Sequence, residues 1–319
     1  MLYAVLAVIG GFVLLVWSAE RFVLGASATA RNLGISPLII GLTIVGFGTS
    51  APELMVSAVA SWDGNPDLAI GNAIGSNIAN IALVLGSAAL VSPIVVRSGV
   101  LRRELPLLLL IILFTLALIL DGDLSRGDGL MLMVGLCMMI YWMVMLGLQT
   151  RTSDPIHGEF DAEMPRKMSM TRALVWLVIG MVMLFVSSRI LVAGAVGIAQ
   201  IFGVSDLVIG LTVIAIGTSL PELAASVISA VKNEADIAIG NVIGSNMFNM
   251  LMVMGTPSII HPGVFGHEVL IRDFPIMILL TLIMGRKVLI SGHGKFTRID
   301  GGVLVSCFIA YQAFLFFSI

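Results

Sequence analysis

The stretch GTSAPE at residues 48–53 returns as GTSLPE at residues 217–222, and this duplication decides the fold. Around it, residues 34–86 align without a gap with residues 203–255 at a constant offset of 169 residues. Of the 53 aligned positions, 26 are identical. The two halves of the chain are therefore predicted to be copies of one structural unit.

A second motif, GN-x-IGSN, repeats at the same offset, at residues 71–77 and 240–246. Asn80 and Asn249 continue the match a few residues further on. The offset carries one pair of neighbouring apolar stretches onto another, so whole groups of helices are expected to be duplicated.

The composition is that of a membrane protein. Hydrophobic residues make up 58% of the 319 residues, and charged residues only 11%, whereas soluble domains carry about 25% charged residues. Many apolar stretches reach the roughly 20 residues that a helix needs to cross a bilayer. Residues 1–18 lack a positive n-region and a convincing cleavage site, so we expect them to start the first span rather than a signal peptide.

Ten apolar stretches, separated by turn-forming and charged residues, are expected to form transmembrane helices. They are residues 2–29, 37–62, 67–91, 105–120, 129–148, 172–200, 206–231, 236–260, 269–285 and 299–318. The expected division is a first five-helix repeat (1–148), a short cytoplasmic linker (149–171) and a second five-helix repeat (172–319). Because five is odd, the second repeat enters the bilayer from the opposite side. The expected fold is an all-α membrane protein of ten transmembrane helices in two inverted five-helix repeats, as in many secondary transporters.

Basic residues indicate the orientation of the chain. Of the 17 Lys and Arg residues, 13 fall in the odd-numbered connections between spans. Cytoplasmic loops carry such an excess, so both termini are expected outside. Arg21 and Arg189 lie within spans near their ends, where interfacial snorkelling explains them. The expected location is the plasma (inner) membrane, as a multi-pass protein.

Several classes of function are disfavoured by the same inspection. The net charge of −2 gives no sign of a nucleic-acid partner. Cys137 and Cys307 lie in apolar stretches and predict packing rather than a disulfide framework. The four histidines fall in loops or at span ends, which disfavours a haem, quinone or zinc site within the membrane. No cofactor is therefore expected. The acidic residues of the linker 149–171 could form a regulatory cation site, but a solvated linker is the favoured interpretation.

The GTS-x-PE motifs place polar groups in the middle of two spans. Thr49, Ser50 and Glu53 share one helical face, and the second copy repeats that face. The residues of the second copy are Thr218, Ser219 and Glu222. An ionised carboxylate at this depth is costly unless it meets a cation, a partner or water. A pair of protonated acids bonded to neighbours is the structural alternative, which the matched duplication disfavours.

The prolines and the second motif add further oxygen atoms. Pro52 and Pro221 disturb the turns before them, which is expected to free carbonyls near Gly46 and Ala215. Ser76 and Asn80 share a face of the following helix, as do their counterparts Ser245 and Asn249. The glycines of this motif are interpreted as packing residues. Calcium takes six to eight hard oxygen ligands, and sodium has nearly the same radius, so this set predicts a site for either cation.

The two GTS-x-PE and two GN-x-IGSN segments resemble the alpha-repeats of the calcium/cation antiporter superfamily, which includes the sodium/calcium exchangers. The resemblance covers the whole chain. It implies antiport of calcium against another cation by alternating access, with spans 1 and 6 sliding as a gate pair against an ion-binding core. The implied partners are calcium and sodium ions and the lipid bilayer, and the implied transport unit is a monomer.

The resemblance also implies roles for individual residues. It implies a calcium site formed by Thr49, Glu53, Thr218 and Glu222. It implies flanking sodium sites formed by Ser50, Ser76, Ser219 and Ser245, with carbonyls near Gly46 and Ala215. Asn80 and Asn249 would complete the central position.

Two positions depart from the pattern of sodium/calcium exchangers. Asn249 stands where they generally carry an aspartate, which removes one potential negative charge and puts exchange of three sodium ions for one calcium in doubt. Gly46 replaces a usual alanine, and because this position offers a backbone ligand, the change is expected to be mild.

Other functions remain open on the sequence alone. A buried carboxylate can hold a proton, so protons are an alternative counter-ion, and potassium is another. An intramembrane hydrolase would use Ser50 or Ser219 as nucleophile, but no His or Lys base lies in a span and no G-x-S-x-G motif is present. A cation channel is a third class, which ion flux without counter-transport would reveal.

Overall fold

The computed structural model describes the chain except for residues 65, 97–100, 151–167, 203–214, 291–293 and 319. It is mostly helical, and η marks a π-helical turn. The first half contains α1 (Leu2–Leu33), α2 (Pro37–Ile40), η1 (Gly41–Val45), α3 (Gly46–Thr49), α4 (Ala51–Trp62), α5 (Pro66–Ala79), η2 (Asn80–Leu85), α6 (Gly86–Val91), β1 (Ile94–Val96), α7 (Leu101–Leu118), β2 (Asp123–Leu124) and α8 (Arg126–Thr150). The second half contains α10 (Met170–Ile201), α12 (Ala215–Thr218), α13 (Leu220–Val231), α14 (Ala235–Phe248), η4 (Asn249–Val253), α15 (Gly255–Ile260), β3 (Gly263–Val264), η5 (Val269–Asp273), α16 (Phe274–Ile290), β4 (Gly294–Phe296) and α17 (Arg298–Ser318).

Seven helical segments in the described part of the chain are long and apolar enough to cross a membrane. They are Leu2–Leu33, Pro37–Trp62, Leu68–Val91, Arg126–Met145, Met170–Ile201, Ala235–Ile260 and Arg298–Leu315. These coincide with seven of the ten expected spans, and α7, α13 and α16 occupy the described parts of the other three. Most of the expected linker, and the acidic residues in it, lie outside the described residues.

Each copy of the first motif interrupts its helix at the same residue. Ser50 separates α3 from α4 with φ −79° and ψ 1°, and Ser219 separates α12 from α13 with φ −88° and ψ 7°. The cause is the proline two residues later, which has no N–H and crowds the carbonyl of the preceding turn. The expectation that Pro52 and Pro221 disturb the turns before them is therefore confirmed.

Each copy of the second motif leads into a π-helical turn. In the first copy this turn is η2, which begins at Asn80, and in the second it is η4, which begins at Asn249. π-Helical turns are rare and occur frequently at functional sites. Their matched positions indicate that the duplication extends to the irregular parts of the backbone.

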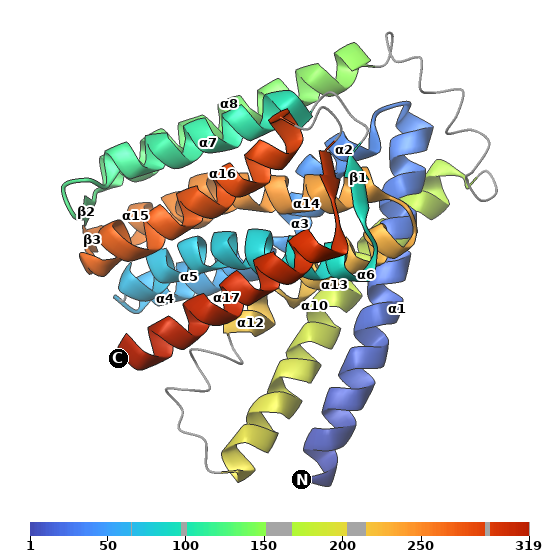
Figure 1. Cartoon of the computed structure of the whole chain (residues 1–319), viewed down its shortest axis with the longest axis horizontal. Coiled ribbons are helices and arrows are strands. Elements are labelled where there is room, and N and C mark those ends of the chain that lie inside the picture. Colours follow the sequence, from blue (N-terminus) through green and yellow to red (C-terminus); the bar gives the residue numbers. More distant parts are fainter. Residues whose placement is uncertain (65, 97–100, 151–167, 203–214, 291–293, 319) are drawn as a thin grey trace.

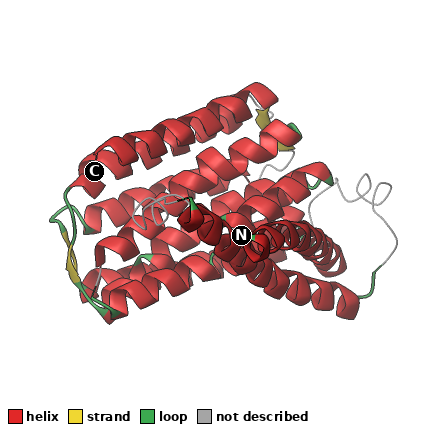
Figure 2. Ribbon diagram, turned by 90° about the horizontal axis from the view of Figure 1, so that it is seen from below, coloured by secondary structure: helices red, strands yellow, loops and turns green. Residues whose placement is uncertain are grey.

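The helices α1 and α10 form a separate pair. They lie side by side and cross the remaining helices at a steep angle (Figures 1 and 2). Their backbones approach closely at glycines: a Cβ on Gly25 would lie 2.3 Å from the Leu177 nitrogen, and one on Gly180 would lie 2.5 Å from the Phe22 nitrogen. Small residues permit this kind of approach between membrane helices.

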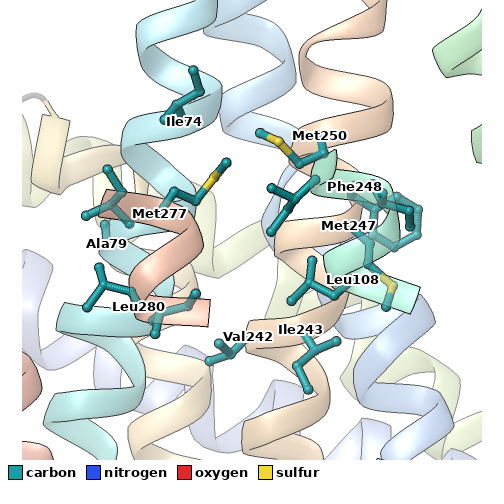
Figure 3. Packing of buried hydrophobic residues seen from close by; sticks show 14 of the residues in the cluster. Ile74, Ala79, Leu108, Val242, Ile243, Met247, Phe248, Met250, Met277 and Leu280 are labelled. Atoms are coloured by element: carbon teal, nitrogen blue, oxygen red, sulfur yellow. The ribbon is translucent and has the colours of Figure 1, made fainter. Parts of the chain in front are cut away.

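The other helices pack around an apolar core to which both halves contribute. Figure 3 shows Ile74 of α5, Leu108 of α7, Phe248 of α14 and Met277 of α16 together in this core. Two short antiparallel strand pairs, β1 with β4 and β2 with β3, also join the two halves. The helices that carry the repeated motifs are thus held by a core that neither half could form alone.

Candidate cation site

Glu53 and Glu222 lie in the first turns of α4 and α13, and each side chain is only 1% exposed. The helix breaks at Ser50 and Ser219 place both carboxylates at helix N-termini, where backbone N–H groups favour negative charge. The two carboxylates are close enough to repel each other. The structure thus brings together the two acids that the sequence places in separate halves of the chain.

Each carboxylate faces a hydroxyl of the other copy. Glu53 lies beside the Ser219 hydroxyl, and Glu222 lies beside the Thr49 hydroxyl. Among the described residues, none of the four carboxylate oxygens has a partner in hydrogen-bonding geometry. Ionised carboxylates that are buried without partners are costly. The site is therefore suited to receive positive charge.

Thr49 links the first copy of the motif to the second. Its Oγ1 donates to Asn241 Oδ1 at 3.0 Å and lies 3.3 Å from Ser245 Oγ. Asn241 and Ser245 belong to α14, so the hydroxyl of one copy is positioned by the amide and hydroxyl of the other. This arrangement places Ser245 in the site, as the motif predicts.

The carbonyl of Gly46 is not free in this structure. It accepts the Ser50 N–H at 3.2 Å and the Ser245 hydroxyl at 3.3 Å. The expectation of a freed carbonyl at this residue is therefore wrong. A Cβ on Gly46 would lie 2.9 Å from the Ser245 nitrogen, so an alanine here would require a shift of α14. In the second copy, the Ser219 N–H donates to the Ile216 carbonyl at 3.1 Å instead.

Asn72 and Asn241 are site residues that the sequence reasoning missed. Asn72 Nδ2 donates to the Glu53 carbonyl at 2.9 Å and to Ser57 Oγ at 2.8 Å. Asn241 Nδ2 makes the same two bonds in the second copy, to the Glu222 carbonyl at 3.3 Å and to Ser226 Oγ at 2.9 Å. These asparagines fix the main-chain carbonyl of each glutamate in position. Their place within both GN-x-IGSN motifs was the signal that could have identified them.

The remaining candidate residues lie on the same helices. Ser50 and Ser219 are buried at the helix breaks, and their hydroxyls have no hydrogen-bond partner among the described residues. The amides of Asn80 and Asn249 are likewise buried without such a partner. Ser76 is 5% exposed on α5.

Thr218 is half-buried at the end of α12. It completes the ten residues that the sequence proposes, which all lie on the helices or helix breaks of the two motifs.

Asn77 and Asn246 lie outside this group. Each donates its side-chain amide to the main-chain carbonyl of the other, at 3.2 Å and 3.5 Å. This reciprocal pair joins α5 to α14, so it fixes the two motif helices relative to each other, and the Oδ1 atoms of both residues are buried without a hydrogen-bond partner among the described residues.

The donors of the site are hard oxygen atoms of carboxyl, hydroxyl and amide groups. Within the described residues, no group of three or more His, Cys, Asp or Glu side chains could hold a metal ion. Two acids supported by neutral oxygens suit a hard cation such as calcium or sodium, whereas soft metals prefer sulfur or imidazole ligands.

Comparisons with known proteins agree with this description. The chain matches the family described as "Sodium/calcium exchanger protein" over residues 3–151 and 172–317. It is 50% identical over 319 residues to the antiporter candidate CaxA of Alkalimonas amylolytica, covering 100% of both chains. It is 43% identical to the inner membrane protein YrbG of Escherichia coli (strain K12), covering 96% of each chain.

A solved structure has the same fold. It is that of the sodium-calcium exchanger NCX_Mj soaked with sodium and strontium ions, which superposes with a TM-score of 0.84. The sequence identity is 32%, and the match covers 98% of each chain. The fold is therefore shared over nearly the full length, and the resemblance seen in the repeated motifs is confirmed.

Proposed function

Since the chain belongs to the sodium/calcium exchanger protein family, we propose that it is a secondary active antiporter that exchanges calcium for sodium or protons by alternating access. The ions are its substrates, and no cofactor takes part. The observation that carries this proposal is the reciprocal placement of Glu53 and Glu222, buried together with no hydrogen-bond partner for their carboxylates among the described residues.

The proposed architecture is ten transmembrane helices in two inverted five-helix repeats. The matched helix breaks at Ser50 and Ser219 support it, as do the matched π-helical turns at Asn80 and Asn249. In transporters built this way, the substrate site lies at the interface between the repeats. The contacts between Thr49 and α14 support a site at such an interface.

The proposed ligands are those that the resemblance of the two motifs implies. Calcium would be held by Thr49, Glu53, Thr218 and Glu222, completed by Asn80 and Asn249. Sodium would be held by the neighbouring serines Ser50, Ser76, Ser219 and Ser245. The oxygens of the glutamates, Ser50, Ser219 and the two asparagines support this assignment, because within the described part of the chain they lack the hydrogen bonds that buried polar atoms normally make.

The charge of the site limits the exchange. Glu53 and Glu222 are the acids that we place in it, and together they balance one divalent or two monovalent cations. Asn249 supplies an amide rather than a third carboxylate. We therefore propose that the chain exchanges calcium with a smaller number of counter-ions than a site with three acids would bind.

The proposed setting is the inner membrane of a prokaryotic cell, with both termini outside and a single chain as the transport unit. The name of the relative YrbG as an inner membrane protein supports the location. The excess of Lys and Arg in the odd-numbered connections supports the orientation.

Calcium flux into vesicles that contain the purified protein tests the proposal. Sodium, potassium and proton gradients are imposed one at a time, and the gradient that drives uptake names the counter-ion. In Glu53→Gln and in Glu222→Gln, we expect uptake to fall by at least about 100-fold, because a charge that balances the ion is lost.

A matched control is Glu104→Gln. Glu104 is fully buried on α7, and its carboxylate also has no hydrogen-bond partner among the described residues, but it lies outside the two motifs. Uptake is expected to continue in this variant. Calcium uptake that persists in both motif variants would refute the proposal, and calcium flux that needs no counter-ion would indicate a channel.

A further inference from the structure

Two polar contacts tie α1 to the turn that follows α13. Glu20 Oε1 lies 3.8 Å from Lys232 Nζ, and the Ser27 hydroxyl donates to Glu234 Oε1 at 2.6 Å. Burial raises the pKa of Glu234, and the Ser27 hydrogen bond opposes that effect. The half-buried Glu234 carboxyl thus lies where the α1–α10 pair meets the helices that carry the ion site.

The α1–α10 pair is built to move as one body. The Arg21 guanidinium stacks over the Trp17 ring at 5.7 Å and over the Trp176 ring of α10 at 4.9 Å. The two tryptophan rings also meet edge to face, with centroids 6.4 Å apart. Stacked cations and aromatic pairs add to the close backbone packing of the two helices. A force applied to α1 is therefore transmitted to α10.

The repeat offset of 169 residues carries this contact to the other half of the chain with its charges reversed. Glu20 corresponds to Arg189 on α10, and Lys232 corresponds to Asp63 after α4. Both Arg189 and Asp63 are exposed and lie in the described part of the chain, and they form no ion pair with each other. One pair is therefore formed and its counterpart is separated in the same structure.

Inverted repeats place equivalent residues at opposite faces of the membrane. The Glu20–Lys232 contact then lies at one face, and the equivalent pair, Arg189 and Asp63, lies at the other. Ser27 corresponds to Val196, which has no hydroxyl. The hydrogen bond to Glu234 thus has no equivalent donor from the other half, which favours the contact seen in this structure.

We propose that Glu20–Lys232 and Arg189–Asp63 are alternating latches between the α1–α10 pair and the ion-binding helices. Each latch closes one face and opens when the pair shifts and the other latch forms. Reversal of the charges preserves an attractive pair at each face. It also prevents the two latches from exchanging partners, because Glu20 would repel Asp63 and Arg189 would repel Lys232. This inference rests on the proposed alternating-access function.

Crosslinking tests whether the latches alternate. Cys137 and Cys307 are exposed, so both are first replaced by serine. The pairs Glu20→Cys with Lys232→Cys and Asp63→Cys with Arg189→Cys are then treated with a short bifunctional maleimide at a series of sodium, calcium and proton concentrations. We expect the two crosslinking yields to change in opposite directions. Yields that rise together, or an Asp63–Arg189 pair that never crosslinks, would overturn the proposal.

A single charge reversal tests the coupling between the two faces. Lys232→Glu, added to the Asp63→Cys and Arg189→Cys chain, is expected to raise its crosslinking yield about twofold to fivefold, because an exposed ion pair is replaced by repulsion. Adding Glu20→Lys restores an attractive pair and should return the yield. Lys295→Glu, an exposed lysine on β4, is the matched control and should change nothing. An unchanged yield in Lys232→Glu would contradict the coupling.

The crosslinking readout does not depend on which ions are carried. If the yields alternate but no calcium flux occurs, the proposed substrate is wrong and the latches stand. If flux occurs with the expected loss in Glu53→Gln but the yields do not alternate, the latches are wrong and the proposed function stands.

Discussion

The two copies of the motif form the same hydrogen bonds, and the described residues pack more tightly around the second copy than around the first. In the second copy, all of an 18-residue apolar stretch within Ala235–Ile260 is buried, whereas 72% of such a stretch within Leu68–Val91 is buried in the first copy. A Cβ on Gly240 would lie 2.7 Å from the Leu38 carbonyl oxygen, and one on Gly244 would lie 2.3 Å from that of Leu42. The equivalent glycines of the first copy, residues 71 and 75, have no described atom within 4 Å of such a Cβ.

This comparison distinguishes the hydrogen bonds at the glutamates from the packing around the motif helices. The hydrogen bond from an asparagine side chain to the main-chain carbonyl of each glutamate is the same in both copies, although Asn72 is half-buried and Asn241 is fully buried. The chemistry is therefore held by bonds within each copy. In the described residues, α14 packs against α2 and η1 of the first copy, and the segment equivalent to these, residues 203–214, lies outside the described residues. Substitutions on this packed face of α14 should therefore lower stability. Substitutions of the hydrogen bonds at each glutamate should affect both copies, with an additional cost where a residue also bonds to the other copy.

Gly244→Ala is expected to have the largest effect on stability. The new methyl group would meet the backbone of η1, which cannot rotate away, so the free energy of unfolding should fall by about 3 kcal/mol or more. Thermal unfolding of the detergent-solubilised protein measures this. The control is Gly10→Ala on α1, where a Cβ meets no atom within 4 Å and helix propensity favours alanine. Equal losses at both glycines would contradict the tight packing of α14.

Asn241→Ala is expected to cost more than Asn72→Ala. Both variants lose the bonds to the glutamate carbonyl and to a serine, but Asn241 also accepts the Thr49 hydroxyl from the other copy. We expect losses of about 2 kcal/mol for Asn241→Ala and about 1 kcal/mol for Asn72→Ala, because buried groups left without partners are costly. Unfolding and calcium affinity should rank the two variants in the same order, and the reverse order would show that the link to Thr49 does not matter.

Asn80→Asp and Asn249→Asp are expected to have smaller and similar effects. Both side chains are buried without hydrogen-bond partners among the described residues, at equivalent positions beside the site. Either carboxylate adds a negative charge, so calcium affinity should rise by about tenfold or less in each variant. Binding to the purified proteins measures this. Opposite changes in the two variants would mean that the two positions are not chemically equivalent.

Much of the site could be predicted because its two motifs each occur twice in the sequence. Glu53 and Glu222 are recognisable as a pair from the duplication, and the prolines explain the helix breaks from local backbone chemistry alone. The cross-links between the copies could not be predicted, because the Thr49 bond to Asn241 depends on how two distant segments pack. The same holds for the carbonyl of Gly46, which the sequence suggests to be free and which Ser245 occupies.

The environment of Arg21 is a similar case. Its place near a span end predicts snorkelling to the interface, whereas the structure stacks it on two tryptophans. The partner Trp176 lies in the other half of the chain, so no local pattern could indicate this contact. The π-helical turns at Asn80 and Asn249 were also missed, since no residue type marks them as proline marks a break.

Calcium binding to the purified full-length protein, measured by calorimetry, tests the central claim most directly. The account predicts saturable binding in the unsubstituted chain, loss of that binding in both Glu53→Gln and Glu222→Gln, and its retention in Glu104→Gln. Binding that survives in the two motif variants, or that is lost equally in Glu104→Gln, would contradict a site formed by the two repeated glutamates.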